Sequence, residues 1–297
     1  MIEIKSHLNR RMTNEEARNL LDELLQKIDP MSGKAVELLR MGDVVDEAKT
    51  KIPKPGEIVG LSTGYKEVDW MTGGLELGEV SVWYGGTSSG KSQITQNIAL
   101  NMAMRGIPIL KLPLEMGVYL NTARLLKMYG EDKEQEFRQL PIYYPDSKRM
   151  DISTLANTVA EAKSNLGIQA VVVDQLQQLV PRQGTNLVET ISATTDELHK
   201  IADESQVHIL LISHINRSGA QAGPPSLQEL KGSASIEQDA DICISLYRNT
   251  EDEDLENAPD YRAPLQLLQT KNRNRGGAGK FKSLRVMNNM RLLSMEI

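Results

Sequence analysis

The sequence predicts an α/β domain with a central, mainly parallel sheet, and three observations support this. From about residue 60, short apolar segments typical of strands alternate with longer amphipathic segments typical of helices. A glycine-rich segment at residues 85–92 joins the first of these strands to a helix. Several of the apolar strands also end in a polar or charged residue, at the edge where open parallel sheets bind their ligands.

The expected elements follow from the pattern of apolar residues. Strands are expected at residues 79–84, 107–112, 142–144, 170–174, 208–213, 241–247 and 265–270. Helices are expected at residues 92–105, 151–164 and 187–205, where apolar side chains recur on one face. Such helices would flank the twisted sheet.

The first fifty residues differ from the rest of the chain. Thr13 and Glu16 have the spacing of a capping box, and apolar residues then recur at helical spacing until an Asp-Pro pair ends the pattern. This helix either packs on the core of its own chain or docks on a neighbouring subunit. We expect residues 1–50 to be a helical linker or oligomerisation segment and residues 51–297 to be the main domain, which begins with a Pro- and Gly-containing linker at 51–56.

Composition limits the classes of protein to which the chain can belong. Of its 297 residues, 40% are apolar and 25% are charged, the balance of a soluble globular protein. The longest apolar runs, such as residues 209–212, fall far short of the ~20 residues that span a bilayer, so we expect no membrane-spanning helix. Residues 1–11 lack the apolar block of a secretory signal, and the single cysteine, Cys243, allows neither an internal disulfide nor a cysteine-based zinc site. We therefore expect a cytoplasmic protein.

The strongest local pattern is the glycine-rich segment between the first strand and its helix. It fits the phosphate-binding pattern G-x-x-x-x-G-K-[ST] with Gly85, Gly86, Thr87, Ser88, Ser89, Gly90, Lys91 and Ser92. Glycines let the backbone turn its N–H groups toward phosphate oxygens, and the helix N-terminus adds a favourable dipole. Lys91 would reach the β- and γ-phosphates of ATP or another NTP or dNTP, and Ser92 would ligate Mg²⁺.

Three further strands end in residues that suit the same chemistry. Asp174 follows an apolar strand and, beside a phosphate loop, would hold the metal and its water shell. Glu115 lies just past another strand, where it either polarises the water that attacks the γ-phosphate or is a solvated loop acid. His214 follows a third strand and either contacts the γ-phosphate or forms an ordinary hydrogen bond.

The C-terminal segment is basic, although the net charge of the chain is −6. Residues 271–297 contain seven Lys or Arg residues against one acid, Glu296. The first cations, Lys271, Arg273 and Arg275, follow a strand, and we expect them on the same edge of the sheet as the phosphate site. They either complete the site of a neighbouring subunit as an arginine finger, bind a nucleic-acid backbone, or form a solvated charge run.

A second candidate for phosphate contact lies in a polar segment at residues 216–235, whose Gly, Ser and Pro content is typical of a loop. Loops of this length in a compact domain are often functional. Within it, Lys231, Gly232 and Ser233 either present a charge and backbone N–H groups to phosphates or belong to an ordinary surface loop.

Taken in order, these segments resemble the motor domain of hexameric replicative DNA helicases of the DnaB type, a RecA-like P-loop NTPase fold. The resemblance extends over about residues 62–287, and the ordered set is far more specific than any single motif. Besides the phosphate loop, the matching segments are residues 63–69, 73–79, 114–116, 171–179 (VVVDQLQQL), 212–217, 232–241 and 271–274.

The resemblance implies a role for each matching residue of the nucleotide site. Lys91 and Ser92 would bind phosphate and metal, and Asp174 would be the metal-linked acid. Glu115 would be the catalytic base, and His214 would be the sensor of the γ-phosphate.

The resemblance also implies contacts beyond the chain's own nucleotide. Arg273 would be a finger that acts on the adjacent subunit's nucleotide, with Lys271 as a second phosphate contact. Lys231, Gly232 and Ser233 would lie on a central-channel loop that holds single-stranded DNA by its phosphates, without sequence preference.

Some residues depart from the family pattern. His214 stands where the family usually has Gln, Lys231-Gly232 where it often has Arg-Glu, and Arg275 where it tends to have Gly. Bacterial members also carry a helical N-terminal domain, and phage relatives carry a primase domain, for which residues 1–50 are too few. We expect that segment to be the linker helix that packs on the adjacent subunit, in a minimal helicase of phage or plasmid type; a phage protein would act in the host cytoplasm.

The function that the resemblance implies is a ring-forming, NTP-driven replicative helicase, most simply a homo-hexamer, that moves on single-stranded DNA and unwinds forked duplex. A loader or a primase would be its partner, and no membrane is involved. Two alternatives stay open: a filament-forming recombinase ATPase of the RecA or RadA type, and a nucleotide-gated helicase loader or scaffold. Closed rings would separate the helicase from a filament, and repeated turnover during strand displacement would separate a motor from a loader.

Overall fold

The structure of the chain is a computed structural model. It describes residues 38–50, 57–146, 150–180, 187–215, 224–230, 236, 238–248, 262–276, 278–287 and 289–294. The chain divides into two units, Met1–Ile52 and Pro53–Ile297. The described part of the first unit contains helix α3 (Met41–Thr50). The helix predicted within residues 13–28 lies outside the described residues, and the linking role of residues 1–50 stays a prediction.

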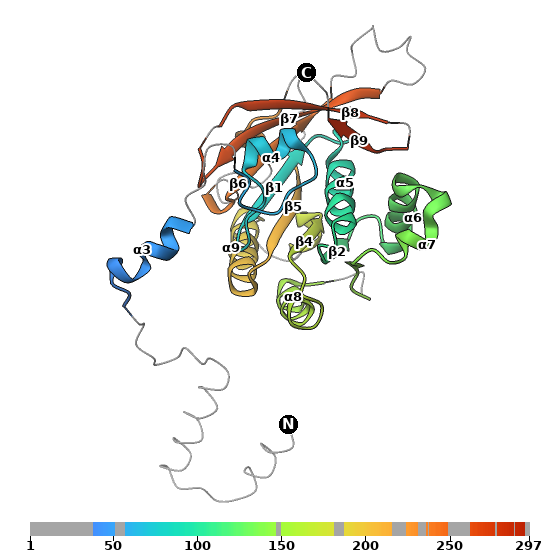
Figure 1. Ribbon diagram of the computed structural model, residues 1–297. Coiled ribbons are helices and arrows are strands. Elements are labelled where there is room, and N and C mark those ends of the chain that lie inside the picture. Colours follow the sequence, from blue (N-terminus) through green and yellow to red (C-terminus); the bar gives the residue numbers. More distant parts are fainter. Residues whose placement is uncertain are drawn as a thin grey trace, which may run out of the picture. The chain divides into compact units, whose positions relative to one another are not determined.

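The described strands of the second unit form one nine-stranded mixed sheet (Figure 1). In chain order they are β1 (Val80–Gly85), β2 (Ile109–Pro113), β3 (Ile142–Tyr143), β4 (Ala170–Asp174), β5 (His208–His214), β6 (Ile242–Tyr247), β7 (Arg262–Asn272), β8 (Lys280–Val286) and β9 (Leu292–Ser294). Six of them, in the spatial order β3-β2-β4-β5-β1-β6, run parallel. Strands β7, β8 and β9 continue the sheet in antiparallel fashion beyond β6. The expected mainly parallel α/β sheet is therefore confirmed, with an antiparallel extension.

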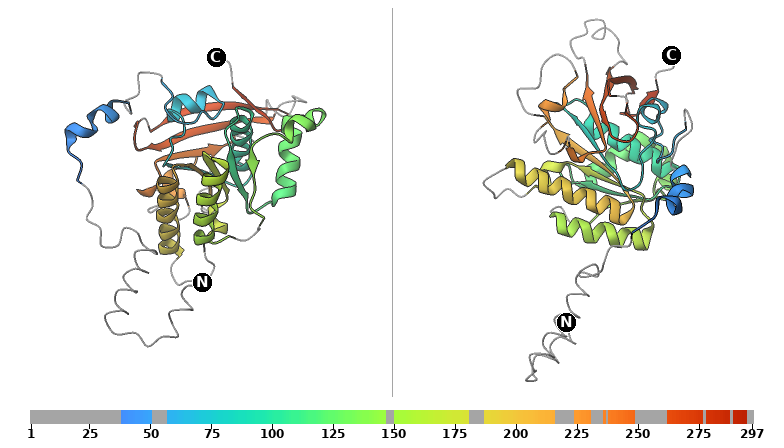
Figure 2. Two further views of the ribbon diagram at one scale, coloured as in Figure 1. Left: turned by 60° about the horizontal axis from the view of Figure 1, so that its bottom comes forward. Right: turned by 90° about the vertical axis from the view of Figure 1, so that its left-hand side faces the viewer.

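Helices cover both faces of this sheet (Figures 1 and 2). The helices are α4 (Lys66–Thr72), α5 (Lys91–Met104), α6 (Val118–Tyr129), α7 (Glu134–Phe137), α8 (Ile152–Leu166) and α9 (Leu187–Ser205), with short 3₁₀ turns at Glu131–Lys133, Leu176–Gln178 and Leu227–Glu229. Helices α8 and α9 lie side by side on one face, where they share a core cluster with the strands. Helices α4 and α5 cover the other face, and α6 packs on α5. Among the helices that the structure describes, none combines the length and apolar character needed to cross a bilayer.

The central strands are apolar throughout because both of their faces are covered. In β4, Val171 and Val173 belong to the cluster beneath α8 and α9, whereas Ala170 and Val172 belong to the cluster beneath α4 and α5. Successive side chains of a strand point to opposite faces, so a strand buried on both sides needs a continuous apolar run rather than an alternating one. This explains why these strands were recognisable from the sequence.

Most expected elements are confirmed, and the misses have physical causes. Strand β4 and helix α9 have the expected bounds, and the other expected elements differ by a few residues at their ends. Helix α6 was not expected, because its buried residues, Asn121, Leu125 and Met128, form a narrow stripe that includes a polar side chain. Strand β8 is not among the predicted strands, because Lys280, Lys282 and Arg285 make it part of the basic C-terminal segment.

A fully buried histidine links β1, β5 and the loop that precedes β1. One ring nitrogen of His208, Nε2, lies 2.8 Å from Oγ of Ser81, and the other, Nδ1, lies 2.8 Å from the carbonyl oxygen of Glu76. Burial lowers the pKa of His208 from its ordinary value of 6.5 to about 4, an effect that the hydrogen bond to Glu76 only partly offsets. The folded protein therefore favours the neutral imidazole.

We expect this histidine to make the fold sensitive to acid. Between pH 6.5 and pH 4 the unfolded chain would bind a proton on His208 that the folded chain excludes, so the free energy of unfolding falls by on the order of 3 kcal/mol as the pH drops through this window. Urea unfolding curves measured across it should show that His208→Gln loses much of this pH dependence. Equal pH dependence in both proteins would contradict the assignment.

Candidate functional site

The candidate phosphate-binding loop lies between β1 and α5, as expected. Strand β1 is buried along its whole length, and the chain leaves it at Gly85, where a Cβ atom would lie 2.5 Å from the carbonyl oxygen of Leu246. Gly90, which precedes α5, has a φ of 96°, a conformation that side chains other than glycine rarely adopt. Gly85 and Gly90 are therefore required, the first by the close approach of β6 and the second by the turn into the helix.

Lys91 lies inside this loop rather than in solvent. Its side chain is only 6% exposed, and its ammonium donates hydrogen bonds to the carbonyl oxygens of Gly85 (2.9 Å) and Gly86 (2.6 Å). Burial lowers the pKa of Lys91 to about 8, against the opposing effect of the negative charges of Asp174 and Glu115. A partly desolvated ammonium held at the helix start is suited to bind an anion.

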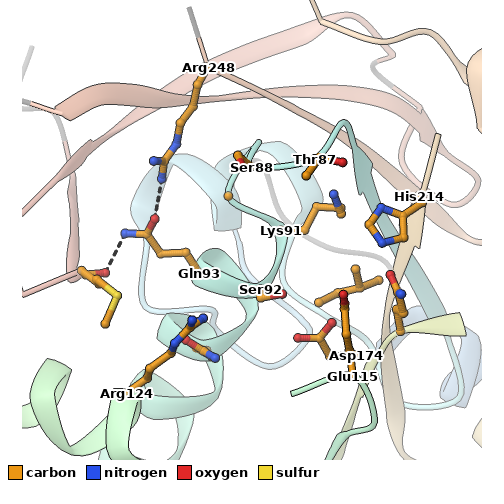
Figure 3. Close-up of a pocket in the computed structure, with 15 residues that line it drawn as sticks. Thr87, Ser88, Lys91, Ser92, Gln93, Glu115, Arg124, Asp174, His214 and Arg248 are labelled. Carbon is orange, nitrogen blue, oxygen red and sulfur yellow. Dashed lines mark hydrogen bonds between the residues drawn. The ribbon is translucent and has the colours of Figure 1, made fainter. Parts of the chain in front are cut away.

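The two acidic candidates lie together opposite Lys91. Asp174 is the last residue of β4 and is 2% exposed, and its carbonyl oxygen accepts the backbone N–H of Glu115 at 3.2 Å. Strands β2 and β4 are aligned so that Pro113 pairs with Asp174, which brings the turn that follows β2 to the same edge. Figure 3 shows the carboxylates of Glu115 and Asp174 next to each other, beside Ser92.

His214 closes the other side of the same site. It ends β5, and its strand partner in β1 is Gly85, the first residue of the phosphate loop. Its ring faces Lys91 across the cavity (Figure 3). A hydrogen bond of 3.0 Å from Nε2 of Gln177 to Oγ of Ser213 links the end of β5 to the turn after β4.

These residues line a single cavity of about 280 Å³. Its walls also contain residues that sequence reasoning did not identify, which are Gln93, Gln96, Arg124, Gln175, Ile212, Arg248 and Met290. Arg124 approaches from α6 on the side of Ser92, and Arg248 donates a hydrogen bond to Oε1 of Gln93 (Figure 3). Arg248 directly follows β6, so the search for polar residues at strand ends would have found it; Arg124 belongs to a helix that was not expected.

The arrangement can hold a triphosphate and a divalent cation at adjacent positions. The N–H groups of the loop and the ammonium of Lys91 suit phosphate oxygens. Oδ1 of Asp174 is buried without a hydrogen-bond partner, and the hydroxyl of Ser92 lies near it in the same cavity. The described residues hold no group of three or more His, Cys, Asp or Glu side chains that could bind a metal by themselves. The oxygen atoms of Asp174 and Ser92 would be two protein ligands, which suits Mg²⁺ bound together with phosphates and water.

The predicted finger residues lie elsewhere, and the expectation that they share the edge of the phosphate site was wrong. Strand β7 runs antiparallel to β6, so Asn272 pairs with Ile242 at the start of β6 rather than at its end. The next residue, Arg273, is 47% exposed and pairs with Asp241 at 3.2 Å. Its backbone N–H also bonds the carbonyl oxygen of Asp241, whose own N–H bonds Val80 at the start of β1. Reversal of strand direction thus places these cations at the opposite edge of the sheet.

The edge that holds Arg273 is itself rich in charge. Asp241 also lies 3.5 Å from Nε2 of His199, and Nζ of Lys271 donates to the carbonyl oxygen of Gln238 at 3.1 Å. Burial, followed by the charges of Asp241 and Glu76, raises the pKa of Glu79 to about 7. The segment that contains Lys231, Gly232 and Ser233 lies outside the described residues, and before it Leu230 is buried and bridges Ile215.

Fold and cavity together define the class of protein: a P-loop nucleotide-binding domain in which parallel strands bring the phosphate loop, an acid and a histidine to one edge. The family model described as the DnaB-like helicase C terminal domain matches residues 127–291, more than half of the chain. The chain therefore belongs to the DnaB-like helicase C-terminal domain family. The match begins after the phosphate loop and Glu115, so those two assignments depend on the motif and the geometry.

Curated relatives agree with this family. The chain is 27% identical over 230 residues to the replicative DNA helicase DnaB of Leifsonia xyli subsp. xyli, which covers 69% of this chain and 50% of that protein. It is 28% identical over 246 residues to the replicative DNA helicase DnaC of Bacillus subtilis, covering 74% and 54% of the two chains. A probable plasmid replicative DNA helicase of Chlamydia psittaci is 26% identical over 213 residues, covering 64% and 46%. The chain spans about half the length of these relatives.

Solved structures show the same fold. One of them, an isolated ATPase domain, superposes with a TM-score of 0.74 at 24% identity, over 86% of this chain and 97% of that one. A DnaB-like replicative helicase, solved to show its interactions with primase, superposes with a TM-score of 0.75 at 23% identity, over 95% of this chain and 72% of that one. Both likenesses bear out the expected RecA-like α/β fold.

Lys91→Ala should abolish hydrolysis and weaken nucleotide binding while the fold stays intact. The change removes the cation of the phosphate site but also a buried charge whose desolvation opposes folding. Titration with a fluorescent ATP analogue should show a loss of affinity of roughly 10- to 100-fold, the range for a hydrogen bond to a charged group, and the melting temperature should hold. Unchanged turnover would mean that the loop does not bind the hydrolysed nucleotide.

Proposed function

We propose that this chain is the motor of a ring-forming, NTP-driven replicative DNA helicase that moves along single-stranded DNA and unwinds duplex. The observation that carries the proposal is the cavity in which Lys91, Asp174 and Glu115 meet, in a chain of the DnaB-like helicase family. The matching relatives are named replicative DNA helicases. The chain spans only about half of their length, so the unwinding activity is proposed for this chain and does not follow from the match alone. Family membership favours a helicase over the recombinase and loader alternatives.

In the proposed site the residues act on ATP or another NTP in distinct ways. Lys91 and the loop N–H groups would hold the phosphates, and Ser92 and Asp174 would hold Mg²⁺, which supplies charge stabilisation at the phosphates when bound. The exposed carboxylate of Glu115, beside Asp174, would orient a water molecule and accept its proton. His214 would contact the γ-phosphate from the end of β5.

The position of Arg273 supports a site shared between subunits. Arg273 and Lys271 lie at the edge of the sheet opposite their own phosphate loop, so within one chain they are badly placed to reach it. In a head-to-tail assembly, the same edge of one subunit can face the phosphate loop of the next. We therefore propose that Arg273 acts as a finger in trans, with Lys271 beside it, in a homo-oligomeric ring, most simply a hexamer.

The remaining contacts of the proposed helicase involve DNA and a second protein. Lys231, Gly232 and Ser233 would hold single-stranded DNA in the channel of the ring. The matched helicase that was solved to show interactions with primase supports a primase as partner of this chain, and a loader stays a prediction. Residues 1–50 would pack on the adjacent subunit.

Arg273→Ala should leave nucleotide binding unchanged and lower turnover by about 10³-fold or more, the range attributed to an arginine finger. Mixing this variant with Lys91→Ala subunits should restore part of the activity, because a ring can then join an intact phosphate loop to an intact finger. Steady-state hydrolysis at several mixing ratios measures the effect. If no ratio restores activity, the site is not shared.

Glu115→Gln should abolish unwinding of a forked substrate while ATP still binds, since the amide keeps the shape of the side chain but cannot take a proton. A strand-displacement assay with excess ATP measures unwinding, and the ATP-analogue titration checks binding. Full unwinding by the variant would assign proton transfer to another group.

Negative-stain images of the unaltered chain with ATP and single-stranded DNA should show closed rings. Open helices in these images would favour the filament.

A further inference from the structure

The two tryptophans of the chain lie in opposite environments. Trp83, in β1, is completely buried in the core, whereas Trp70, near the end of α4, is 59% exposed. The neighbours of Trp70 in the helix, Val68 and Met71, are fully buried against the sheet. The helix therefore directs its apolar face into the core and holds a large aromatic side chain at the surface.

Strand β8 supplies two cations to this exposed ring. Alternate residues of β8 face α4: Leu284 and Val286 lie in the same core cluster as Val68 and Met71. Lys280 and Lys282 continue the same face of the strand, because side chains two positions apart share a face. Their ammonium nitrogens lie 5.0 Å and 4.8 Å from the centroid of the Trp70 ring, within the range of cation–π contacts.

The group is held in place, and no described carboxylate pairs with its two lysines. Nζ of Lys280 donates a hydrogen bond of 3.2 Å to the carbonyl oxygen of Met71, which anchors the strand side chain to the helix. Within the same helix, Asp69 accepts hydrogen bonds from the backbone and side chain of Thr63. Within the described part of the chain, neither Lys280 nor Lys282 forms an ion pair with a carboxylate. Two uncompensated ammonium groups therefore flank one exposed indole.

We propose that Trp70, Lys280 and Lys282 form a binding site for single-stranded nucleic acid, with a base stacked on the indole and adjacent phosphates on the two ammonium groups. This site uses none of the residues that line the nucleotide cavity and none of the segment 231–233. It rests on the proposed function only in the choice of DNA over RNA. It also gives a role to part of the basic C-terminal segment that the nucleotide site does not use.

The chemistry of the three side chains favours a single strand over other anions. Aromatic rings beside cations are the usual means of binding single strands without sequence preference, because every base has a face that can stack. In a duplex the base faces are stacked on each other and cannot reach an indole. An acidic peptide would use the ammonium groups but would leave the exposed ring without a function.

Tryptophan fluorescence tests the site directly, because Trp83 is buried and serves as an internal reference. Titration of the full-length chain with oligothymidylate, in the absence of hydrolysis, should quench the emission of Trp70. In Trp70→Phe the remaining emission of Trp83 should not respond to the oligonucleotide and should report an intact core. A wild-type emission that does not move while a labelled oligonucleotide binds would overturn the proposal.

Anisotropy of the labelled oligonucleotide measures the contribution of each part. Trp70→Ala should weaken binding about 10-fold, within the range for loss of one stacked base. Lys280→Gln with Lys282→Gln should lower the slope of log affinity against log salt by about 1.4, since two phosphate contacts on a single strand are lost. Matched controls are Tyr119→Ala, which removes an exposed aromatic ring of α6, and Lys200→Gln, which removes an exposed cation of α9. Equal losses in the controls would overturn the proposal.

Two other outcomes would also overturn it. Equal quenching by polyglutamate would assign the surface to an acidic peptide, and emission that changes with protein concentration alone would assign it to contact between copies of the chain. A failure of the proposed helicase is distinguishable, because Lys91→Ala should lose hydrolysis and still show quenching by oligothymidylate. DNA-independent ATP turnover should be unchanged in Trp70→Ala.

Discussion

The parallel alignment of β2, β4, β5 and β1 is the constraint on which the nucleotide site depends. It sets Gly85 opposite His214 and Pro113 opposite Asp174, so the phosphate loop, the acids and the histidine leave the sheet at the same edge. A slip of two residues between neighbouring strands would preserve every apolar face but move these groups apart by about 7 Å, well beyond hydrogen-bond reach.

This edge of the sheet also concentrates buried charge. Lys91 and Asp174 are almost completely buried, and Lys111, in β2, is fully buried with its ammonium unpartnered among the described residues. Desolvation lowers the pKa of both lysines to about 8, and the negative charge of Asp174 opposes that effect in each case. Because isolated buried charges are costly, each group is tolerated only with the others near it. The fold thus brings these charges together without a ligand, an arrangement that would favour electrostatic catalysis in the proposed nucleotide site.

The reversal of chain direction at β7 separates two sets of functional candidates. The six parallel strands, β1 to β6, bring their carboxyl ends to the phosphate edge. Strand β7 instead brings Lys271 and Arg273 to the opposite edge, where Asp241 pairs with Arg273. A chain that carries complementary groups on opposite edges suits heterologous association, in which each subunit meets the next in the same way. The antiparallel extension also provides the face of β8 on which Lys280 and Lys282 meet Trp70.

Much of this protein was readable from local patterns. The apolar run of β4, the glycine-rich loop from Gly85 to Ser92 and the amphipathic repeat of α9 each depend on residues close together in the chain, and each was found with the right type of structure. The ordered motifs also led to the family, which the comparisons bear out. Polar residues at strand ends were assigned to a common edge correctly for Asp174, Glu115 and His214.

What the sequence by itself determined was therefore the type of most elements of the sheet and its helices, the chemistry of the phosphate loop and the family. The tertiary structure alone decided which distant residues became neighbours: Arg124 beside Ser92, Arg273 beside Asp241 and Trp70 beside two lysines of β8. The physical reason is that helix and strand periods arise from neighbouring residues, whereas the order and direction of strands arise from the packing of the whole sheet. The antiparallel direction of β7 places Arg273 at the edge opposite the phosphate loop, and no local pattern in the chain encodes that direction.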